Sequence, residues 1–341
     1  MKILDEFTRK ATLTYARMRQ PRNLLGPTLF PNKTVNELSF EYWKDLNHLP
    51  VMASVQAFGA EAEIASRDGA QKISGEIPTI KRKIPLSGRA LVALRREGAG
   101  DYDFVRNQLY NDLDNMIDAV QARIEKMRID ALTTGQLQLA ENGVIMTVDY
   151  GVPAEHKEIL LGNSLWSAAQ TATPLDNIQE WVDTVVANTG IRPARILTSN
   201  TVVANMLKCA EVRTYLGIPG GGALPTLAAL NEFLRASELP TIATYDLQVR
   251  QQLADGAYQQ VRYFPDNMFI LLPGEALGDT LVGPTEDAML DADVDTAEIA
   301  GVYAAVYKES MDPPVITTKA AASAIPTFPM ADAVFQAQVL V

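Results

Sequence analysis

The chain has 341 residues, of which 47% are hydrophobic and 21% charged, a composition typical of a folded protein and not of a disordered one. Its formal net charge of −11 argues against broad, non-specific nucleic-acid binding, because phosphate contacts need a basic surface. A single cysteine excludes an intramolecular disulfide and indicates a reducing compartment, and two histidines leave little for histidine-based catalysis or a zinc site. The sequence has no apolar run of membrane-spanning length and no apolar signal core at its N-terminus, so we expect neither a membrane partner nor export.

Residues 1–49 predict an N-terminal arm and not a compact domain. Residues 2–20 have the periodicity of a short amphipathic helix, which Pro21 ends, and its apolar face consists of Leu4, Phe7, Ala11, Tyr15 and Met18. Residues 23–31 contain prolines and are expected to be extended. In residues 34–43 apolar and polar side chains alternate, which predicts a strand. The helix fits a core position and an arm that lies on a neighbouring molecule equally well.

Residues 50–99 predict a two-stranded loop without a core of its own. Apolar and polar side chains alternate only weakly along this segment, and residues 74–84 have strand character with few apolar side chains. Because an isolated pair of strands is marginally stable, we expect this loop to pack on its own domain or on another molecule. The far limb of the loop has no acid between residues 81 and 96, and its cations are Lys81, Arg82, Lys83, Arg89, Arg95 and Arg96.

This basic limb has three interpretations: a solvated face, a contact with an acidic neighbour, or a contact with DNA. The acidic balance of the whole chain favours a protein neighbour. An acidic run that includes Glu286 and Asp287 is a candidate partner on another subunit. We therefore treat the six cations as candidates for contacts between subunits.

Residues 102–134 predict one long helix, because they contain no glycine or proline and their apolar side chains recur every three or four positions. The stripe consists of Val105, Leu109, Leu113, Met116, Val120, Ile124, Met127 and Ala131. Asp101 or Asp103 is expected to cap the start, and Gly135 is expected to end the helix. At about 1.5 Å per residue the helix is roughly 50 Å long. No second long stripe offers a coiled-coil partner, which favours a helix that lies across a sheet.

A β-hairpin is predicted directly after the long helix, because Asn142-Gly143 separates two β-prone runs at residues 136–140 and 144–149. An α/β region follows after a polar connector at residues 166–173. Its expected helices are residues 174–188, which Gly190 closes, residues 201–208, which Ser199-Asn200 caps, and residues 227–235. Its expected strands are residues 194–198, 241–249, 258–264 and 268–272. Three further strands are expected at residues 302–308, 314–319 and 333–340.

Three motifs invite a chemical interpretation, and none of them meets its requirements. The glycine-rich residues 217–222 lack the Lys-Ser/Thr pair of a phosphate-binding loop. Residues 291–295 begin like a calcium loop, but Thr296 and Val302 stand where that loop needs glycine and glutamate. Cys209 lies beside an apolar helix with no histidine near it in sequence, which predicts a buried structural thiol. We therefore expect no catalytic, cofactor-binding or metal-binding residues, and a protein that is not an enzyme.

The order of the elements resembles that of the major capsid protein of tailed bacteriophages, and more narrowly that of the lambda-type capsid protein E family. Residues 50–94 carry the resemblance in the loop, where GAEAEI and RDG precede IPTIKRKIPLSGRAL. Residues 263–267 (YFPDN) are similar to the family's segment before a hydrophobic strand, and residues 325–340, which end in PMADAVFQAQVL, resemble its closing strand. The resemblance extends over nearly the whole chain and depends on the ordered set, since no single motif is specific.

The resemblance implies an α+β fold of the Hong Kong ninety-seven type. Residues 1–49 would be the N-terminal arm, residues 50–99 an extended loop reaching over an adjacent subunit, and residues 100–165 a peripheral domain with the spine helix and the hairpin. Residues 166–284 would be the axial domain around the symmetry axes, and residues 285–341 strands that return to the peripheral domain.

The same resemblance implies a structural subunit of an icosahedral phage head, which assembles with itself through pentamers and hexamers into a procapsid and encloses double-stranded DNA. Because the arm is short, a separate scaffolding protein would be needed. A portal is a further implied partner, and a small decoration protein would reinforce a shell without crosslinks. The acidic chain would lie near packaged DNA without gripping it. The expected location is the virion, and the host cytoplasm during assembly.

Two alternatives stay open. An encapsulin-like bacterial shell protein shares the fold but encloses enzyme cargo, and it would need a groove that binds a cargo tail. An α/β enzyme built on residues 166–284 would need a perturbed acid–base pair in a concave pocket. The resemblance of the loop and the C-terminus to the lambda type argues against the shell protein, and the scarcity of histidine argues against the enzyme.

Overall fold

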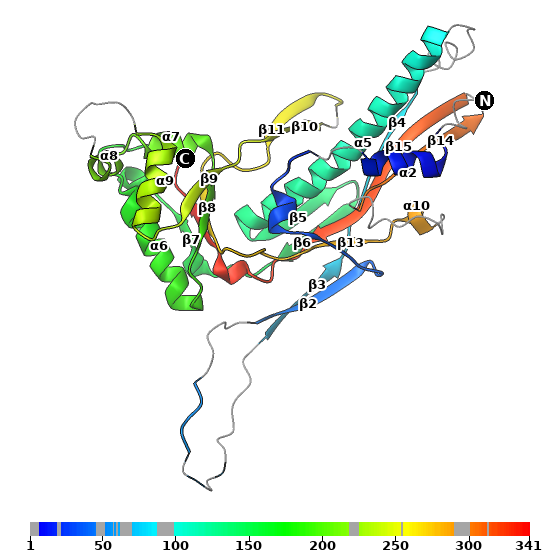
Figure 1. Cartoon of the computed structure of the whole chain (residues 1–341). Helices are drawn as coiled ribbons and strands as arrows, with labels where there is room; N and C mark the ends of the chain where they lie inside the picture. Colours follow the sequence, from blue (N-terminus) through cyan, green and yellow to red (C-terminus); the bar gives the residue numbers. More distant parts are fainter. Residues whose placement is uncertain are drawn as a thin grey trace. The chain divides into compact units, whose positions relative to one another are not determined.

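The computed structural model describes residues 7–18, 22–45, 52–56, 58, 61, 70–86, 99–217, 225–253, 255–289, 301–311 and 314–341 (Figure 1). The chain forms two compact units, each assembled from separate stretches of sequence. The first unit comprises Met1–Phe40, Gly75–Arg128 and Asp279–Thr327, and the second comprises Glu41–Ser74, Ile129–Gly278 and Phe328–Val341. These boundaries cut across the arm, the extended loop and the long helix of the sequence-based division.

The sheet of the first unit is built around the 13-residue strand β15 (Pro314–Pro326). Residues 317–321 of β15 pair with β14 and with β4 at once, so these two strands lie on opposite edges of β15. The next part of β15 pairs with β13, which in turn pairs in parallel with β1. The remaining bounds are β1 Asn32–Thr34, β4 Thr79–Pro85, β13 Thr280–Gly283 and β14 Tyr303–Met311. The predicted strand at 314–319 is thus much longer than expected, and β13 is an addition to the predicted elements.

The long helix α5 (Ala99–Thr134) packs against this sheet, as its unpaired stripe predicted. Leu113, Ile117, Val120 and Ile124 on the helix form one core with Val302 and alanines of the sheet: Ala304, Ala320, Ala322 and Ala324. Small side chains on the sheet leave room for large ones on the helix, which is how two facing surfaces interdigitate at crystal-like density.

The predicted start and end of α5 can be compared with the structure. The helix begins at Ala99, so Asp101 and Asp103 lie inside its first turns and the predicted start was wrong by about one turn. Its end is confirmed: Gly135 has a φ of 73°, and its N–H donates to the carbonyl of Ala131 at 3.0 Å. With 36 residues the helix is about 54 Å long.

The N-terminal segment lies on α5 within the first unit. Helix α2 (Arg9–Met18) packs Tyr15 against Tyr110 with ring centroids 4.6 Å apart, and the Tyr15 hydroxyl donates to Asp114 at 2.9 Å. Met18, which the sequence placed on the same apolar face, is exposed. The helix prediction is therefore confirmed at Arg9–Met18, whereas Phe7 and Thr8 lie outside the helix, and the predicted face is wrong at Ala11 and Met18, which are exposed.

Two further expectations for the first hundred residues need correction. A short helix, α3 (Gly26–Leu29), interrupts the segment predicted to be extended. The strand predicted at 34–43 is two strands, β1 and β2 (Ser39–Asp45). The strand predicted at 74–84 is also two, β3 (Ala70–Glu76) and β4, which do not pair with each other because β3 pairs with β2 and β4 with β15.

The second unit has a five-stranded sheet in the order β7-β16-β12-β8-β9. Its strands are β7 Lys157–Ile159, β8 Arg195–Thr198, β9 Thr241–Thr244, β12 Met268–Leu272 and β16 Phe335–Gln338. Its helices are α6 Pro174–Thr189, α7 Asn200–Met206, α8 Ala210–Tyr215 and α9 Leu227–Ala236, and Figure 1 shows them gathered beside the sheet. The short helical turns of this unit are η1 Ala154–His156, η2 Gly162–Ser164 and η4 Ala331–Ala333.

Several details of this unit were predicted from local signals. The hydroxyl of Ser199 caps α7 by accepting from the N–H of Val202 at 3.1 Å, and Gly190 ends α6 with a φ of 73°. The connector at 166–173 is not simply polar, because Trp166 is fully buried in the core of this unit. The closing strand β16 pairs with β12 and β7, so it joins the second unit and does not return to the sheet that contains β14 and β15.

Two hairpins project from the second unit without joining its main sheet. The first pairs β5 (Gln136–Glu141) with β6 (Val144–Asp149), and Asn142 and Gly143 have φ values of 50° and 85°, which confirms the predicted tight turn. The second pairs β10 (Gln248–Gln252) with β11 (Tyr258–Arg262). The strand expected at 241–249 is therefore split between β9 and β10. None of the described helices is long and apolar enough to cross a lipid bilayer.

Candidate functional site

Three of the six predicted contact cations lie on strand β4. Lys81, Arg82 and Lys83 alternate along it, with Lys81 and Lys83 exposed and Arg82 half-buried. Arg89, Arg95 and Arg96 lie outside the described residues. Because successive side chains of a strand point to opposite faces, Lys81 and Lys83 share one face of the sheet and Arg82 lies on the other.

The two exposed lysines bind acids of their own chain. Lys81 forms an ion pair with Glu286 at the start of α10 (Glu286–Met289), and Lys83 forms one with Glu309 of β14. The third pair on this face joins Lys319 to Asp287 at 2.7 Å. The acidic run that the sequence offered as a partner for another subunit therefore meets the basic limb within one chain.

The pKa values of the second pair move in the directions that mutual attraction requires. The hydrogen bond to Glu309 raises the pKa of Lys83, and the hydrogen bond from Lys83 lowers the pKa of Glu309. The hydroxyl of Thr317 also donates to Glu309 at 2.6 Å. Both groups of this pair are exposed, so solvent screens their attraction and the pair orients the limb more than it stabilises it.

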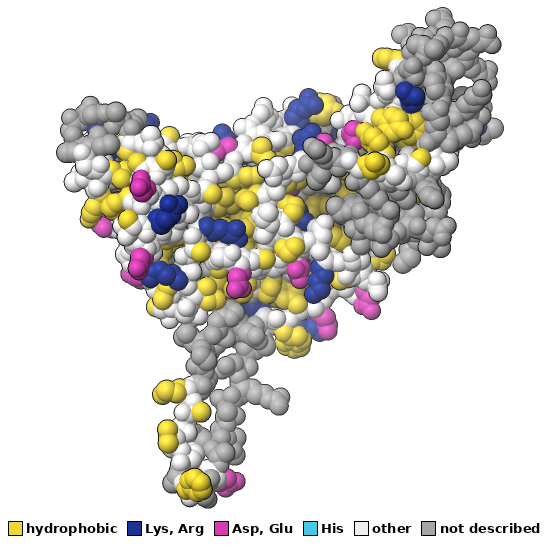
Figure 2. All heavy atoms as spheres, viewed as in Figure 1, with side chains coloured by type: hydrophobic (Ala, Val, Ile, Leu, Met, Phe, Trp, Pro, Cys, Tyr) yellow, Lys and Arg dark blue, Asp and Glu magenta, His cyan; other side chains and the backbone are white. Residues whose placement is uncertain are grey.

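The described part of the extended loop exposes apolar side chains. Met52, Val55 and Phe58 have relative exposures of 93%, 101% and 113%, values that a side chain reaches only when nothing in its own chain covers it. Singly exposed apolar residues are ordinary, but three within seven positions form an uncovered segment. On the surface in view in Figure 2, by contrast, acidic, basic and apolar side chains are interspersed.

Cys209 and His156, the cysteine and the one histidine in the described part of the chain, are both buried. Cys209 is fully buried, as predicted, and burial together with Glu211 raises its pKa to about 11, so the thiol stays protonated at neutral pH. His156 is fully buried, and its Nε2 lies 3.0 Å from the amide of Asn188. Among the described residues no three metal-binding side chains gather in one place. The calcium-like residues 291–295 and most of the glycine-rich loop at 217–222 lie outside the described residues.

Acid is expected to destabilise the second unit through His156. Burial lowers its pKa in the folded chain below the ordinary value of 6.5, against the opposing effects of Asp332 and Glu155. Below that value the unfolded chain binds more protons than the folded chain, so stability falls as the pH decreases toward the folded pKa. The free energy of unfolding should therefore drop less between pH ~7.5 and ~5.5 in His156→Gln than in the wild type. Equal drops in both proteins would contradict this role.

A buried polar cluster on α5 was missed by the sequence analysis, which identified only the apolar stripe of this helix. Glu125 is fully buried and lies 3.7 Å from Arg128, which is itself buried. Glu125 accepts from the N–H of Gly26 at 2.9 Å, and Arg128 donates to Thr280 at 2.7 Å and to Asn32 at 2.5 Å. Burial lowers the pKa of Arg128 to about 10.

This cluster fastens three segments that are far apart in sequence: residues 26–34 with α3 and β1, the strand β13, and the long helix. A Cβ at position 26 would overlap the carboxylate of Glu125, which explains why a glycine stands there. The available signal was the i, i+3 spacing of Glu125 and Arg128, but that spacing is equally common on solvated helix faces.

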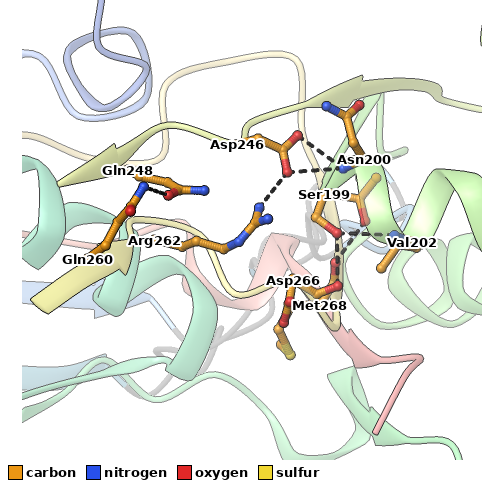
Figure 3. Close-up of polar contacts among 10 residues, drawn as sticks. Ser199, Asn200, Val202, Asp246, Gln248, Gln260, Arg262, Asp266 and Met268 are labelled. Carbon is orange, nitrogen blue, oxygen red and sulfur yellow. Dashed lines mark hydrogen bonds and ion pairs between the residues drawn. The ribbon is translucent and has the colours of Figure 1, made fainter.

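The hairpin β10–β11 is fixed at its base by polar contacts (Figure 3). Arg262 at the end of β11 forms an ion pair with Asp246 at 2.8 Å. The other oxygen of Asp246 accepts from the N–H of Asn200, the first residue of α7, at 3.0 Å. Beside it, the hydroxyl of Ser199 donates to the carbonyl of Asp266 at 2.9 Å. The direction of the hairpin is thus set by the folded core of the second unit.

Two shallow hollows lie on the second unit. One runs along α6 and is lined by Asp176, Gln179, Glu180, Asp183, Thr184 and Ala187. The other lies between the start of β8 and the end of α9, and is lined by residues that include Arg192, Arg235 and Glu238. Neither hollow is lined by Cys209 or His156.

Solved structures similar to this chain share its fold over its whole length. A candidate capsid protein of a prophage of E. coli CFT073 is 15% identical with a TM-score of 0.62, and the alignment covers 97% of each chain. A phage-related protein of Bordetella bronchiseptica RB50 is 14% identical with a TM-score of 0.53 and 96% coverage of each chain. The capsid asymmetric unit of cyanophage A-1(L) is 11% identical with a TM-score of 0.50, covering 94% of this chain and 95% of that one.

These similarities confirm the predicted α+β fold of the Hong Kong ninety-seven type. No curated protein sequence matches the chain. The sequence profile of the family described as "Phage major capsid protein E" matches residues 10–339, which is nearly the whole chain. The chain therefore belongs to the phage major capsid protein E family.

Proposed function

We propose that this chain is the repeating structural subunit of an icosahedral phage head. It assembles with copies of itself through pentamers and hexamers into a procapsid, which encloses the packaged double-stranded DNA. The observation that carries this proposal is the family match over residues 10–339, joined to a fold shared end to end with phage capsid structures. The chain supplies physical support, because Met52, Val55 and Phe58 of its extended loop are apolar side chains that no described residue covers.

The parts of the chain take the roles implied by the family. The arm is residues 1–49, the extended loop 50–99, the peripheral domain 100–165, the axial domain 166–284, and the closing strands 285–341. At the C-terminus the structure supports a change to this division, because the pairing of β16 with β12 groups the last strand with the axial domain.

The basic limb has a role in contacts between subunits. Lys81, Arg82, Lys83, Arg89, Arg95 and Arg96 are its cations, and the pairs of Lys81 and Lys83 within the chain hold β4 in its sheet. Among the described strands none pairs with the outer edge of β4, and Lys81 and Lys83 are exposed on this strand. An acidic surface on a neighbouring subunit suits such an edge, because charges on edge strands orient pairing and prevent unspecific aggregation.

Further partners follow from assembly. A separate scaffolding protein guides assembly, a portal occupies one vertex, and a decoration protein reinforces the shell. The protein performs no catalysis, in keeping with the protonated state of Cys209 and the burial of His156. Its net charge of −11 repels packaged DNA rather than gripping it. Assembly takes place in the host cytoplasm, and the mature protein lies in the virion.

Electron microscopy of the full chain, expressed alone and with a candidate scaffolding protein, tests the proposal directly. Closed or aberrant shells built from many subunits are the expected result. Monomers and small oligomers under both conditions would contradict a lattice function and favour the α/β enzyme. Shells that form spontaneously and retain a tailed cargo enzyme would favour the encapsulin-like alternative.

Replacing Met52, Val55 and Phe58 together by serine is expected to abolish shells without unfolding the subunit. These side chains are uncovered in the single chain, so their removal changes its free energy of unfolding by about 0.5 kcal/mol or less. In a shell, the triple variant loses the apolar area that these three side chains would bury against a neighbouring subunit, and such burial is worth roughly 25 cal/mol per Å². Shell yield by electron microscopy and stability by denaturant titration separate the two effects. Normal shells from the triple variant would contradict the role of the loop.

A further inference from the structure

The β10–β11 hairpin, called the ribbon below, has two open faces. Its register runs from Gln248 opposite Arg262 to Gln252 opposite Tyr258, and among the described strands no third strand joins it. Most of its side chains are exposed. Because an isolated two-stranded hairpin is marginally stable in water, a ribbon built this way gains from a partner surface.

The side chains of the ribbon suit a protein partner that carries negative charge. Five glutamines and two arginines lie on its two strands, and the only acid between residues 247 and 262 is Asp255 in the turn. Arg262 is engaged at the base by Asp246. Arg250 projects further out and stacks over Tyr258, its guanidinium carbon 5.5 Å from the ring centroid. Tyrosine and arginine are enriched at interfaces, where a stacked pair loses little freedom on binding.

The complementary surface is the outward face of α6. Asp176, Glu180 and Asp183 recur at spacings of four and three, so they form one exposed acidic stripe along the hollow described above. Helix α6 contains no lysine or arginine, and none of these carboxylates forms an ion pair within the described part of the chain. Figure 1 shows α6 and the ribbon on opposite sides of the β8–β9 edge of their unit, so one chain does not bring them together.

We propose that the ribbon of one subunit docks on the α6 face of a second copy of this chain. Arg250 meets Glu180 and Asp183, and the ribbon glutamines donate to the remaining carboxylate. Two different surfaces on opposite sides of one unit make a head-to-tail contact, which closes into a ring when the rotation fits. The inference rests on the proposed function, because it names a contact by which shell subunits recognise their neighbours. The polar base of the ribbon serves to aim it.

Charge reversal tests the contact. Arg250→Glu is expected to lower the yield of shells or rings by about tenfold or more, because like charges then face each other across the interface. Reversing the partner as well, with Glu180→Arg and Asp183→Arg added to Arg250→Glu, should restore most of the yield. Lys208→Glu, an exposed cation of the same unit outside both surfaces, is the matched control and should assemble like the wild type. Wild-type yield from Arg250→Glu, or no recovery in the compensated variant, would overturn the proposal.

Cysteine crosslinking tests the same contact without closed shells. Gln260→Cys lies opposite Arg250 on the ribbon, and Asp183→Cys lies on α6. The native Cys209 is buried and does not compete. Under mild oxidation the two full-length variants, mixed, should give a disulfide-linked dimer that a mixture of Gln260→Cys with Lys208→Cys does not give. Crosslinking without shells would count against the head-subunit function and keep the contact; shells without the crosslink would keep the function and overturn the contact.

Discussion

Arg128→Met is expected to destabilise the first unit by about 3–5 kcal/mol, because it leaves the Glu125 carboxylate buried without its cation. Glu125 is fully buried, and its carboxylate lies 3.7 Å from the guanidinium. The substitution also removes donors from Thr280 and Asn32, and so loosens β13 and β1 from the helix. Methionine preserves most of the side-chain volume, so the loss reports charge and hydrogen bonding more than packing.

A double variant separates the pair from its parts. Glu125→Gln with Arg128→Met removes both charges, and its cost should be smaller than the sum of the two single costs. The matched control is Arg22→Met, which breaks the pair of Arg22 with Asp118 on the same helix at 2.8 Å. Arg22 is 65% exposed, so this change should cost about 1 kcal/mol or less.

Denaturant titration followed by circular dichroism measures all of these free energies. Because the chain has two compact units, hydrogen exchange of α3, β1 and β13 localises the loss to the first of them. An Arg128→Met variant that is no less stable than Arg22→Met would show that the buried pair contributes no more than an exposed one.

The elements that could be predicted are those specified by local chemistry. The stripe of α5, the Asn142-Gly143 turn and the Ser199 cap each depend on residues within a few positions of one another, and each lies where the sequence placed it. A helix whose apolar stripe had no sequence partner was correctly expected on a sheet. Local signals also end α6 at Gly190.

The features that could not be predicted depend on which strand, far away in the sequence, each strand pairs with. β13 is short and becomes a strand only between β1 and β15, and β3 and β4 separate because each has a better partner elsewhere. The sequence placed Trp166 in a polar connector, whereas in the structure Trp181 and Phe269 pack against it. Burial of this kind follows from long-range packing, which residue type alone does not encode.

The candidate site follows the same division. That residues 81–83 form a basic strand could be predicted, because charge and alternation are local. That Lys81 meets Glu286 and Lys83 meets Glu309 could not, since those acids lie more than 200 residues further along the chain. The direction of the ribbon could not be predicted for the same reason, because Asp246 and Asn200 become neighbours only through the β8–β9 pairing.

Trp181→Ala is expected to cost the second unit about 3–5 kcal/mol, the loss typical of truncating a large aromatic side chain in a core. Trp181 is 1% exposed and stands at the centre of an aromatic cluster. Its ring centroid lies 6.0 Å from that of Trp166, 5.8 Å from that of Phe269 and 5.3 Å from that of Phe335. These partners come from the connector, from β12 and from β16, so one substitution removes contacts that join the helix layer to the sheet.

Trp181→Phe separates packing from hydrogen bonding. Phenylalanine keeps an aromatic ring but loses the indole N–H, which donates to Glu158 of β7 at 2.5 Å. Its expected cost of about 1–3 kcal/mol reflects a partly buried acceptor left without its donor, together with a smaller ring. Leu161→Ala is the control: Leu161 is 76% exposed, and the change should stay within about 0.5 kcal/mol. If denaturant titration gave Trp181→Ala and Leu161→Ala equal stability, the aromatic cluster would not be the centre of this core.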